Sequence, residues 1–218
     1  EQEDKDVVTA AMELGREKGL TVEAGGAGFG DEIKVNSTSE IIGLGVAFLV
    51  LIFTFGSLVS AGMPLISAVV GVGLGALGVM IATHWIELNN LTPVLAIMIG
   101  LAVGIDYALF IVARFRNELI TSSGLNDLSP KELAQELKKM DKATRAHAMG
   151  MALGTAGSSV VFAGATVVIA LAALTIIGIP FLSTMAIAAA ATVVVAVCVA
   201  LTFIPGLLGL FGTKVFAG

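Results

Sequence analysis

The sequence from Leu91 to Ala113 reads LTPVLAIMIGLAVGIDYALFIVA, an apolar run interrupted by one acidic residue, Asp106. A helix needs about 20 apolar residues to cross the roughly 30 Å hydrocarbon core of a bilayer, and this run meets that length. We therefore expect the stretch to form a membrane-spanning helix. Because acidic side chains are rare inside such spans, Asp106 is the exception to be explained.

Four further apolar stretches of similar length flank this one in the chain. Windows of about 19 residues place the five predicted spans at 41–60, 65–83, 91–113, 151–177 and 181–211. The composition agrees with a membrane protein, because 56% of the 218 residues are hydrophobic and only 13% are charged. The sequence therefore predicts an all-α integral membrane protein, a five-helix bundle whose transmembrane domain covers residues 40–218.

Basic residues gather in one loop, between residues 114 and 150. They are Arg114, Arg116, Lys131, Lys138, Lys139, Lys142 and Arg145. Because loops rich in Lys and Arg stay on the cytoplasmic side, we expect this loop to be cytoplasmic and the segment before the first span to lie outside. Within the loop, the run from Ser129 to Glu132 has the spacing of a capping box and predicts a short helix on the membrane surface.

The segment from residue 1 to residue 39 forms a separate predicted unit. Apolar residues at helical spacing from Val7 to Leu14 indicate an amphipathic helix that ends at Gly15 or Gly19. The residues from Leu20 to Ala24 then predict a short strand, followed by a glycine-rich turn. This α/β segment is too small to bury a core of its own.

Asp106 is the acidic side chain that lies deepest inside the predicted spans. Arg114 follows eight residues later, so a rise of about 1.5 Å per residue puts Asp106 on the order of 12 Å inside the cytoplasmic boundary. A charged Asp at the centre of a span costs about 2.5–3.5 kcal/mol, and such residues generally mark transport or proton pathways. Tyr107 follows directly, and its phenol donates or accepts a hydrogen bond. We therefore interpret Asp106 and Tyr107 as an intramembrane proton relay.

Small residues line one face of the same span, where Ala96, Gly100, Gly104 and Ala108 recur every four residues. A ridge of this kind lets the backbone of another helix approach closely. At about 100° per residue, Asp106 is rotated about 160° from Gly104 and points away from the ridge. With a packing face on one side and an acid on the other, this helix is expected inside a bundle.

Hydroxyl side chains on the fourth predicted span are candidate neighbours of the relay. Thr155, Ser159 and Thr166 fall on one stripe of a helix, with Ser158 beside them. Hydroxyls there can solvate Asp106 or hold a chain of water molecules, which makes Ser159 and Thr166 possible relay neighbours. Equally, each hydroxyl can bond to a carbonyl of its own helix and take no part in proton movement. The sequence alone leaves both alternatives open.

Motifs typical of an enzyme or a metal site are weak. Cys198 is the single cysteine, and His84 and His147 stand apart without the spacing of metal ligands. The run from Gly71 to Gly75 is rich in glycine, but no strand precedes it, so close helix packing is a better interpretation than a phosphate loop. We therefore expect no catalysis, no cofactor, no metal and no nucleic-acid partner.

The run from Gly100 to Glu118, GLAVGIDYALFIVARFRNE, resembles the fourth transmembrane helix of the mycobacterial membrane protein large (MmpL) family, within the resistance-nodulation-division (RND) superfamily. The run from Gly157 to Thr166, GSSVVFAGAT, is similar to the fifth helix of that family. The chain from Ile41 onward resembles helices two to six. The resemblance implies that residues 1–39 are the C-terminal end of a periplasmic porter domain and that the protein is multi-pass in a bacterial plasma membrane.

The resemblance also carries expectations about function. Members of this family have two similar halves, each with an Asp-Tyr pair that faces the other half. By this resemblance, Asp106 and Tyr107 are one half of a relay, and the chain is a fragment of a longer transporter whose second half is its partner. The implied function is export of lipids, glycolipids or related envelope molecules, driven by the proton gradient. Membrane lipids are further expected partners.

Two other classes of function stay open at this point. A sterol-sensing-type module shares the five-helix layout but acts as a lipid-binding regulator without transport turnover. A passive channel subunit is the third interpretation, and it is weakened because the spans show no ring of charges and no unwound, carbonyl-rich segment. Loss of lipid binding without any pH dependence favours the regulator, and single-channel conductance favours the channel.

Overall fold

The computed structural model describes residues 2–23, 37–82, 84, 91–126 and 128–211. The chain divides into two compact units, Glu1–Asn36 and Ser37–Gly218, and each is considered by itself. The glycine-rich turn expected after the first helix lies outside the described residues, as does Thr83 at the end of the second predicted span.

The first unit contains one described helix, α1 (Gln2–Glu17), which confirms the amphipathic helix expected there. The N–H of Leu20 bonds back to the carbonyl of Gly15 at 3.1 Å, and Gly19 adopts a positive φ of 78°, a conformation that glycine reaches without strain. The predicted strand is wrong over residues 20–23, which have no strand pairing among the described residues. A strand requires a partner for its backbone groups, and none of the described residues supplies one.

The second unit is helical throughout its described length apart from short turns, which confirms the all-α class. Its elements are α2 (Ser37–Phe55), α3 (Leu58–Ala82), α4 (Leu91–Ser122), α5 (Pro130–Lys139), α6 (Lys142–Ala152), the π-helical turn η1 (Leu153–Gly157), α7 (Ser158–Ala173), the 3₁₀ turn η2 (Leu174–Ile177) and α8 (Pro180–Phe211). The elements from α6 to η2 follow one another without a break.

Four of these helical segments are long and apolar enough to cross a membrane, namely Leu58–Ala82, Leu91–Ser122, Lys142–Ile177 and Pro180–Phe211. The first predicted span corresponds to α2, whose apolar part, Ile41–Phe55, is shorter. It ends before residue 60 because Gly56 turns the chain with a positive φ of 65°. As a result α3 begins at Leu58, earlier than the expected residue 65, and includes Pro64.

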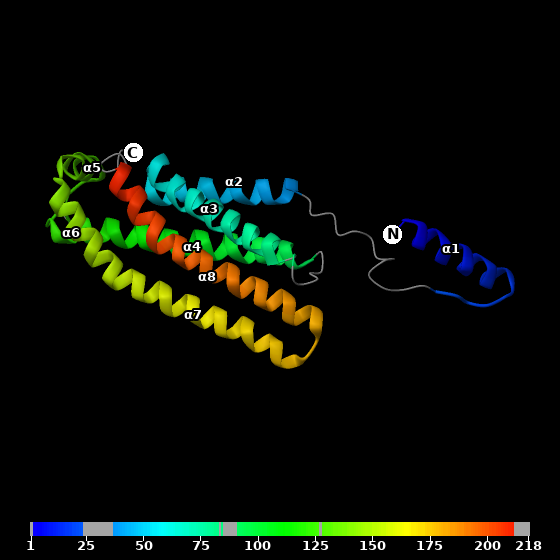
Figure 1. Cartoon of the computed structure of the whole chain (residues 1–218). Helices are drawn as coiled ribbons and strands as arrows, with labels where there is room; N and C mark the ends of the chain where they lie inside the picture. The colour runs from blue at the N-terminus through cyan, green and yellow to red at the C-terminus, as the bar shows by residue number, and fades with distance from the viewer. Residues whose placement is uncertain (1, 24–36, 83, 85–90, 127, 212–218) are drawn as a thin grey trace. The chain divides into compact units, whose positions relative to one another are not determined.

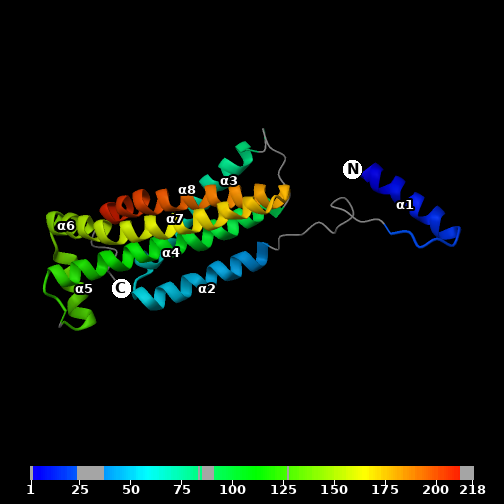
Figure 2. The same ribbon diagram turned by 90° about the horizontal axis from the view of Figure 1, so that it is seen from below.

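Helices α3, α4 and α8 pack against one another at the centre of this unit (Figure 1). Helix α7 packs along α8, as the view from below also shows (Figure 2), and α2 packs against α3. The small-residue ridge of α4 makes the central contacts, since Ala96, Gly100, Gly104 and Ala108 are all buried. A Cβ added to Gly104 would lie 3.2 Å from the backbone Cα of Ala68 in α3. The predicted ridge and its role in close packing are therefore confirmed.

Thr192 of α8 fills the space between two glycines of neighbouring helices. Its side chain is 2% exposed, and its Cγ2 methyl would lie 2.9 Å from a Cβ on Gly75 of α3 and 2.5 Å from a Cβ on Gly100 of α4. Helices α3, α4 and α8 therefore meet at a point where α3 and α4 each carry a glycine, which has no side chain. Close packing is confirmed for Gly71 and Gly75, whereas Gly73 faces open space.

The short helix expected after Ser129 is α5. The carboxylate of Glu132 accepts hydrogen bonds from the backbone N–H of Ser129 at 3.0 Å and from its hydroxyl at 2.6 Å. These two bonds lower the pKa of Glu132, with the bond from the hydroxyl as the larger cause. Leu137 on the opposite face is buried in the core of the unit, so one face of α5 packs and the other carries charge.

Replacing Gly100 with Ala is expected to destabilise the bundle, because the new methyl group would overlap the buried methyl of Thr192. Overpacking of this kind costs about 1–3 kcal/mol. Reversible unfolding in detergent measures the loss. Gly73→Ala is the matched control, since open space surrounds that position.

The double variant Gly100→Ala with Thr192→Ser removes the overlapping methyl and retains the hydroxyl, so it should regain most of the lost stability. Equal stability of the Gly100→Ala and Gly73→Ala proteins would contradict the packing described for Thr192.

The depressed pKa of Glu132 links the stability of α5 to pH. A carboxyl whose folded pKa is lowered stabilises the fold above its unfolded value of about 4.3, and that stabilisation is lost as pH falls through the folded value. Carbon-detected NMR of Glu132 should show a lower titration midpoint in the native protein than in Ser129→Ala. Identical midpoints would show that the two bonds from Ser129 do not hold this carboxylate.

Candidate functional site

Asp106 lies on the face of α4 opposite the buried ridge, as its rotation from Gly104 predicted. Its side chain is exposed, and it makes no hydrogen bond or ion pair with any described residue. It lines a hollow of about 440 Å³ together with Thr54 and Phe55 of α2 and with Leu109, Phe110, Ala113, Arg116 and Asn117 of α4. The acid therefore faces an open surface of the bundle.

A second hollow of about 370 Å³ lies on the other side of the same helix face. Its lining comes from α4, η1 and α7, through Phe110, Ala113, Arg114, Asn117, Thr155, Ala156 and Ser159. Phe110, Ala113 and Asn117 line both hollows, so the two are adjacent. One face of α4, flanked by α2 on one side and by α7 on the other, is thus left uncovered by the described residues. We call it the open face.

Tyr107 points to a different neighbour from Asp106. A Cβ added to Gly164 of α7 would lie 2.5 Å from Cγ2 of Val197 and 3.7 Å from Cε2 of Tyr107, so Val197 of α8 fills the space that this glycine leaves and the tyrosine ring lies beside it. Tyr107 is half-buried and packs against the hydrophobic core. The structure therefore places Asp106 on the open face, whereas Tyr107 lines neither hollow and lies beside Gly164 of α7.

The hydroxyls of Ser159 and Thr166 bond to their own helix. Ser159 donates to the carbonyl of Thr155 at 3.2 Å, and Thr166 donates to the carbonyl of Phe162 at 2.9 Å. Ser159 nevertheless lines the second hollow, which adjoins the one that Asp106 lines, whereas Thr166 lines neither hollow. Of the two alternatives that the sequence left open, the structure shows local bonding, and it brings only Ser159 to the open face.

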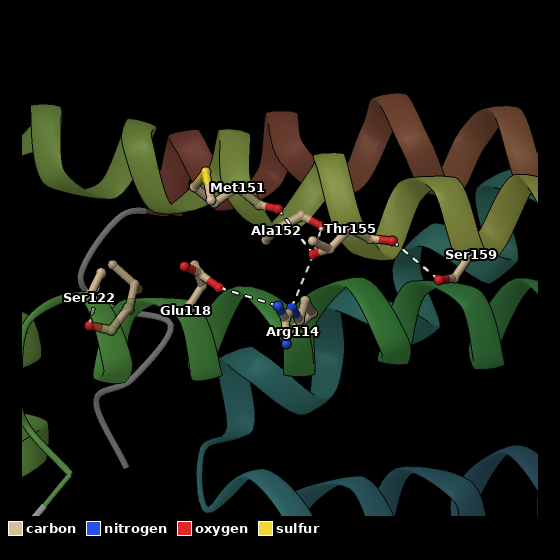
Figure 3. A network of polar contacts seen from close by, with 8 residues as sticks. Arg114, Glu118, Ser122, Met151, Ala152, Thr155 and Ser159 are labelled. Carbon is tan, nitrogen blue, oxygen red and sulfur yellow. Dashed lines mark hydrogen bonds and ion pairs between the residues drawn. The ribbon is translucent and has the colours of Figure 1, made fainter.

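Arg114 connects α4 to the continuous helical segment that runs from α6 through η1 to α7 (Figure 3). Its Nε donates to the hydroxyl oxygen of Thr155 at 3.0 Å, and its guanidinium lies 3.6 Å from a carboxylate oxygen of Glu118 on its own helix. In the sequence, Arg114 indicates only the predicted membrane boundary and the basic loop. The spacing of Arg114 and Glu118, four residues apart on one helix, is a signal for the ion pair. No sequence signal indicated Thr155 as the partner.

Thr155 sits in the middle of the π-helical turn η1. Its hydroxyl donates to the carbonyl of Met151 at 3.0 Å, with the carbonyl of Ala152 at 3.3 Å, while it accepts from Arg114. A π turn widens the helix by one residue and changes which side chains face a neighbour beyond it, and such turns are frequent at functional sites. Here the turn lies beside the open face of α4, one turn before Ser159.

No group of three His, Cys, Asp or Glu side chains comes together within the described part of the chain. Cys198 is exposed on α8, and no disulfide involves it.

Comparisons with known proteins agree with this architecture. A family model described as the MMPL family matches residues 1–124 and 135–217. Membrane protein YdfJ of Bacillus subtilis is 38% identical over 94% of this chain, and the match covers 25% of that relative.

Two mycobacterial relatives are named as exporters. The mycolic acid-containing lipids exporter MmpL11 of Mycolicibacterium smegmatis is 32% identical over 77% of this chain. The trehalose monomycolate exporter MmpL3 of Mycobacterium tuberculosis is 30% identical over 82% of this chain. The chain spans 25%, 15% and 17% of the length of YdfJ, MmpL11 and MmpL3, respectively. With a family model that matches nearly the whole chain, and with a relative of this identity, the chain belongs to the MMPL family.

Proposed function

We propose that this chain is part of a proton-driven exporter of lipids, glycolipids or related envelope molecules. The names of two relatives, exporters of mycolic acid-containing lipids and of trehalose monomycolate, support the substrate class. The single observation that carries the proposal is the position of Asp106. This acid belongs to a membrane-spanning helix, lies on its open face, and makes no hydrogen bond or ion pair with a described residue.

Asp106 is the group that takes up and releases the proton. A carboxylate in lipid requires a polar partner, whereas a protonated carboxyl requires much less. Protonation therefore changes which packing arrangement of a partner on the open face is stable, and a proton gradient shifts the equilibrium between these arrangements. Helix movement couples the change to the outer part of the transporter, and the gradient takes the place of a cofactor.

A second helical half of the same transporter is the partner that would cover the open face. The two hollows, about 440 and 370 Å³, flank α4 and are lined by apolar side chains together with polar and charged ones, namely Thr54, Asp106, Arg114, Arg116, Asn117, Thr155 and Ser159. A mixed surface that carries an acid suits another helix with a matching polar group.

Tyr107 and the hydroxyls of α7 have supporting roles. Tyr107 directly follows Asp106, its ring lies beside Gly164, and its phenol orients the relay. Ser159 donates to its own helix but retains lone pairs that can accept a proton or a water molecule. Thr166 lies two turns further along α7, outside both hollows, and is the second candidate neighbour.

The proposed orientation has residues 114–150 in the cytoplasm and the N-terminal unit, as the end of a porter domain, in the periplasm. The loop carries most of the basic residues near the spans, which favours the cytoplasmic side of a bacterial plasma membrane.

Asp106→Asn in the full-length protein should abolish proton-coupled export, because the amide cannot take up a proton. Transport into vesicles with an imposed proton gradient measures this, and activity should fall to that of vesicles without the protein. Glu136→Gln is the matched control, because it also removes one carboxylate but from the exposed surface of α5, where Glu136 pairs with Lys139.

Full gradient-driven export by Asp106→Asn would refute the relay. If the native protein bound lipid but showed no gradient-dependent transport, the regulatory sterol-sensing-type function would replace the exporter. Melting temperatures of both variants separate loss of function from loss of folding.

The contact between Arg114 and Thr155 is expected to hold the π turn beside the open face. Thr155→Val removes the hydroxyl, and Thr155→Ser retains it. Loss of a net contribution of about 0.5–1.5 kcal/mol should speed hydrogen exchange of the amides in 153–159 by about two- to tenfold in the Val variant.

Arg114→Met should speed exchange at the same amides, because it removes the donor of the contact and leaves the threonine intact. If only Thr155→Val had an effect, the bonds from Thr155 to its own helix would account for the result, and the link between the two helices would be excluded.

A further inference from the structure

A cleft at the opposite side of α4 from the open face lies between α6 and α8. Both helices pack against α4, but they make few contacts with each other. The cleft has a volume of about 320 Å³ and is lined by Phe115, Lys142, Arg145, Ala146, Met149, Pro205, Leu208 and Gly209. The proposed relay uses none of these residues.

The floor of the cleft is apolar. Phe115 of α4 and Leu208 of α8 are only 2% and 3% exposed. Met149 adds an unbranched, flexible side chain that adapts to irregular apolar shapes. Gly209 has no side chain and Pro205 has a compact one, so α8 leaves the cleft open at this point. An engineered apolar cavity of about 150 Å³ binds benzene, and this larger space has room for a stretch of hydrocarbon chain.

Two cations lie at the rim of this apolar floor. Lys142 is exposed and Arg145 is half-buried, and both belong to the first turns of α6. Arg145 uses Nε to donate to the backbone carbonyl of Asp141 at 3.3 Å, which leaves its terminal nitrogens without a described partner. The Asp141 carboxylate itself accepts from the N–H of Thr144 at 3.1 Å as the cap of α6. Among the described lining residues there is no carboxylate to neutralise the two cations.

The cleft also lies at the end of the bundle where two candidate spans terminate. One candidate span begins at Lys142 and another ends at Phe211, so both ends fall at the same end of the bundle. In Figure 2 the last turns of α8, in red, run beside α6 at this end. A ligand bound here therefore has its charged part at the end of the candidate spans and its apolar part beside them.

We propose that the cleft between α6 and α8 binds an anionic phospholipid, with its phosphate at Lys142 and Arg145 and the start of an acyl chain over Phe115 and Leu208. The charge of the rim selects the headgroup, and the apolar floor selects a lipid over a free anion. Basic pockets between membrane helices are known to take anionic headgroups in this way. This site is separate from the proton relay and its occupant is not the exported molecule.

Native mass spectrometry of the full-length protein, purified in detergent, tests the proposal. The protein is offered equal amounts of phosphatidylglycerol and phosphatidylcholine, and the native form should retain phosphatidylglycerol with a clear preference. The double variant Lys142→Gln with Arg145→Gln should lose that preference by roughly tenfold or more, because each cation near a headgroup contributes separately. Lys138→Gln with Lys139→Gln is the matched control, since it removes the same charge from α5 and should keep the preference.

A second variant and a competitor test the apolar part. Gly209→Leu places a side chain in the cleft and should weaken phosphatidylglycerol binding while both cations stay. Inorganic phosphate at millimolar concentration should not displace the lipid. Equal retention of the two lipids, equal loss in both double variants, or displacement by phosphate alone would each overturn the proposal. Melting temperatures in detergent without added lipid show that each variant is folded, so that loss of binding is assigned to the cleft.

Discussion

The close approach of α4 to α3 and α8 is the constraint on which the rest of this structure depends. In lipid, apolar surface gains nothing from burial against another helix, so association rests on close van der Waals packing of small residues. Gly100 and Gly104 allow that approach, and Thr192 and Ala68 occupy the space they leave. Because the ridge commits one face of α4 to packing, the opposite face, which carries Asp106, is free for function.

This division of one helix into a packing face and a functional face was predictable from the sequence. Four small residues in one register, and an acid about 160° away, follow from helical periodicity alone. The number of apolar stretches and the capped helix α5 were predictable for similarly local reasons. The boundaries of α2 and α3 were not, because the break depends on the backbone of Gly56, and an isolated glycine within an apolar run does not show whether it turns the chain.

The parts of the candidate site that the sequence did not reveal depend on contacts between helices. The bond from Arg114 to Thr155 joins residues far apart in the chain, and the π turn that positions Thr155 has no recognisable pattern in the run Leu153–Gly157. Ser159 and Thr166 looked equivalent on a helical stripe, yet only Ser159 lines one of the two hollows of the open face. The strand expected from Leu20 to Ala24 is absent over the described residues 20–23 for a related reason, since strands need partners that a local pattern does not supply.

The central claim is that Asp106 changes its protonation state on the open face of α4. Infrared difference spectroscopy of the full-length protein in lipid, recorded as the pH is changed, observes this directly through the C=O stretch of a protonated carboxyl. A carboxyl band should appear on acidification of the native protein and be absent from Asp106→Asn. Identical difference spectra for the native protein and this variant would contradict the claim.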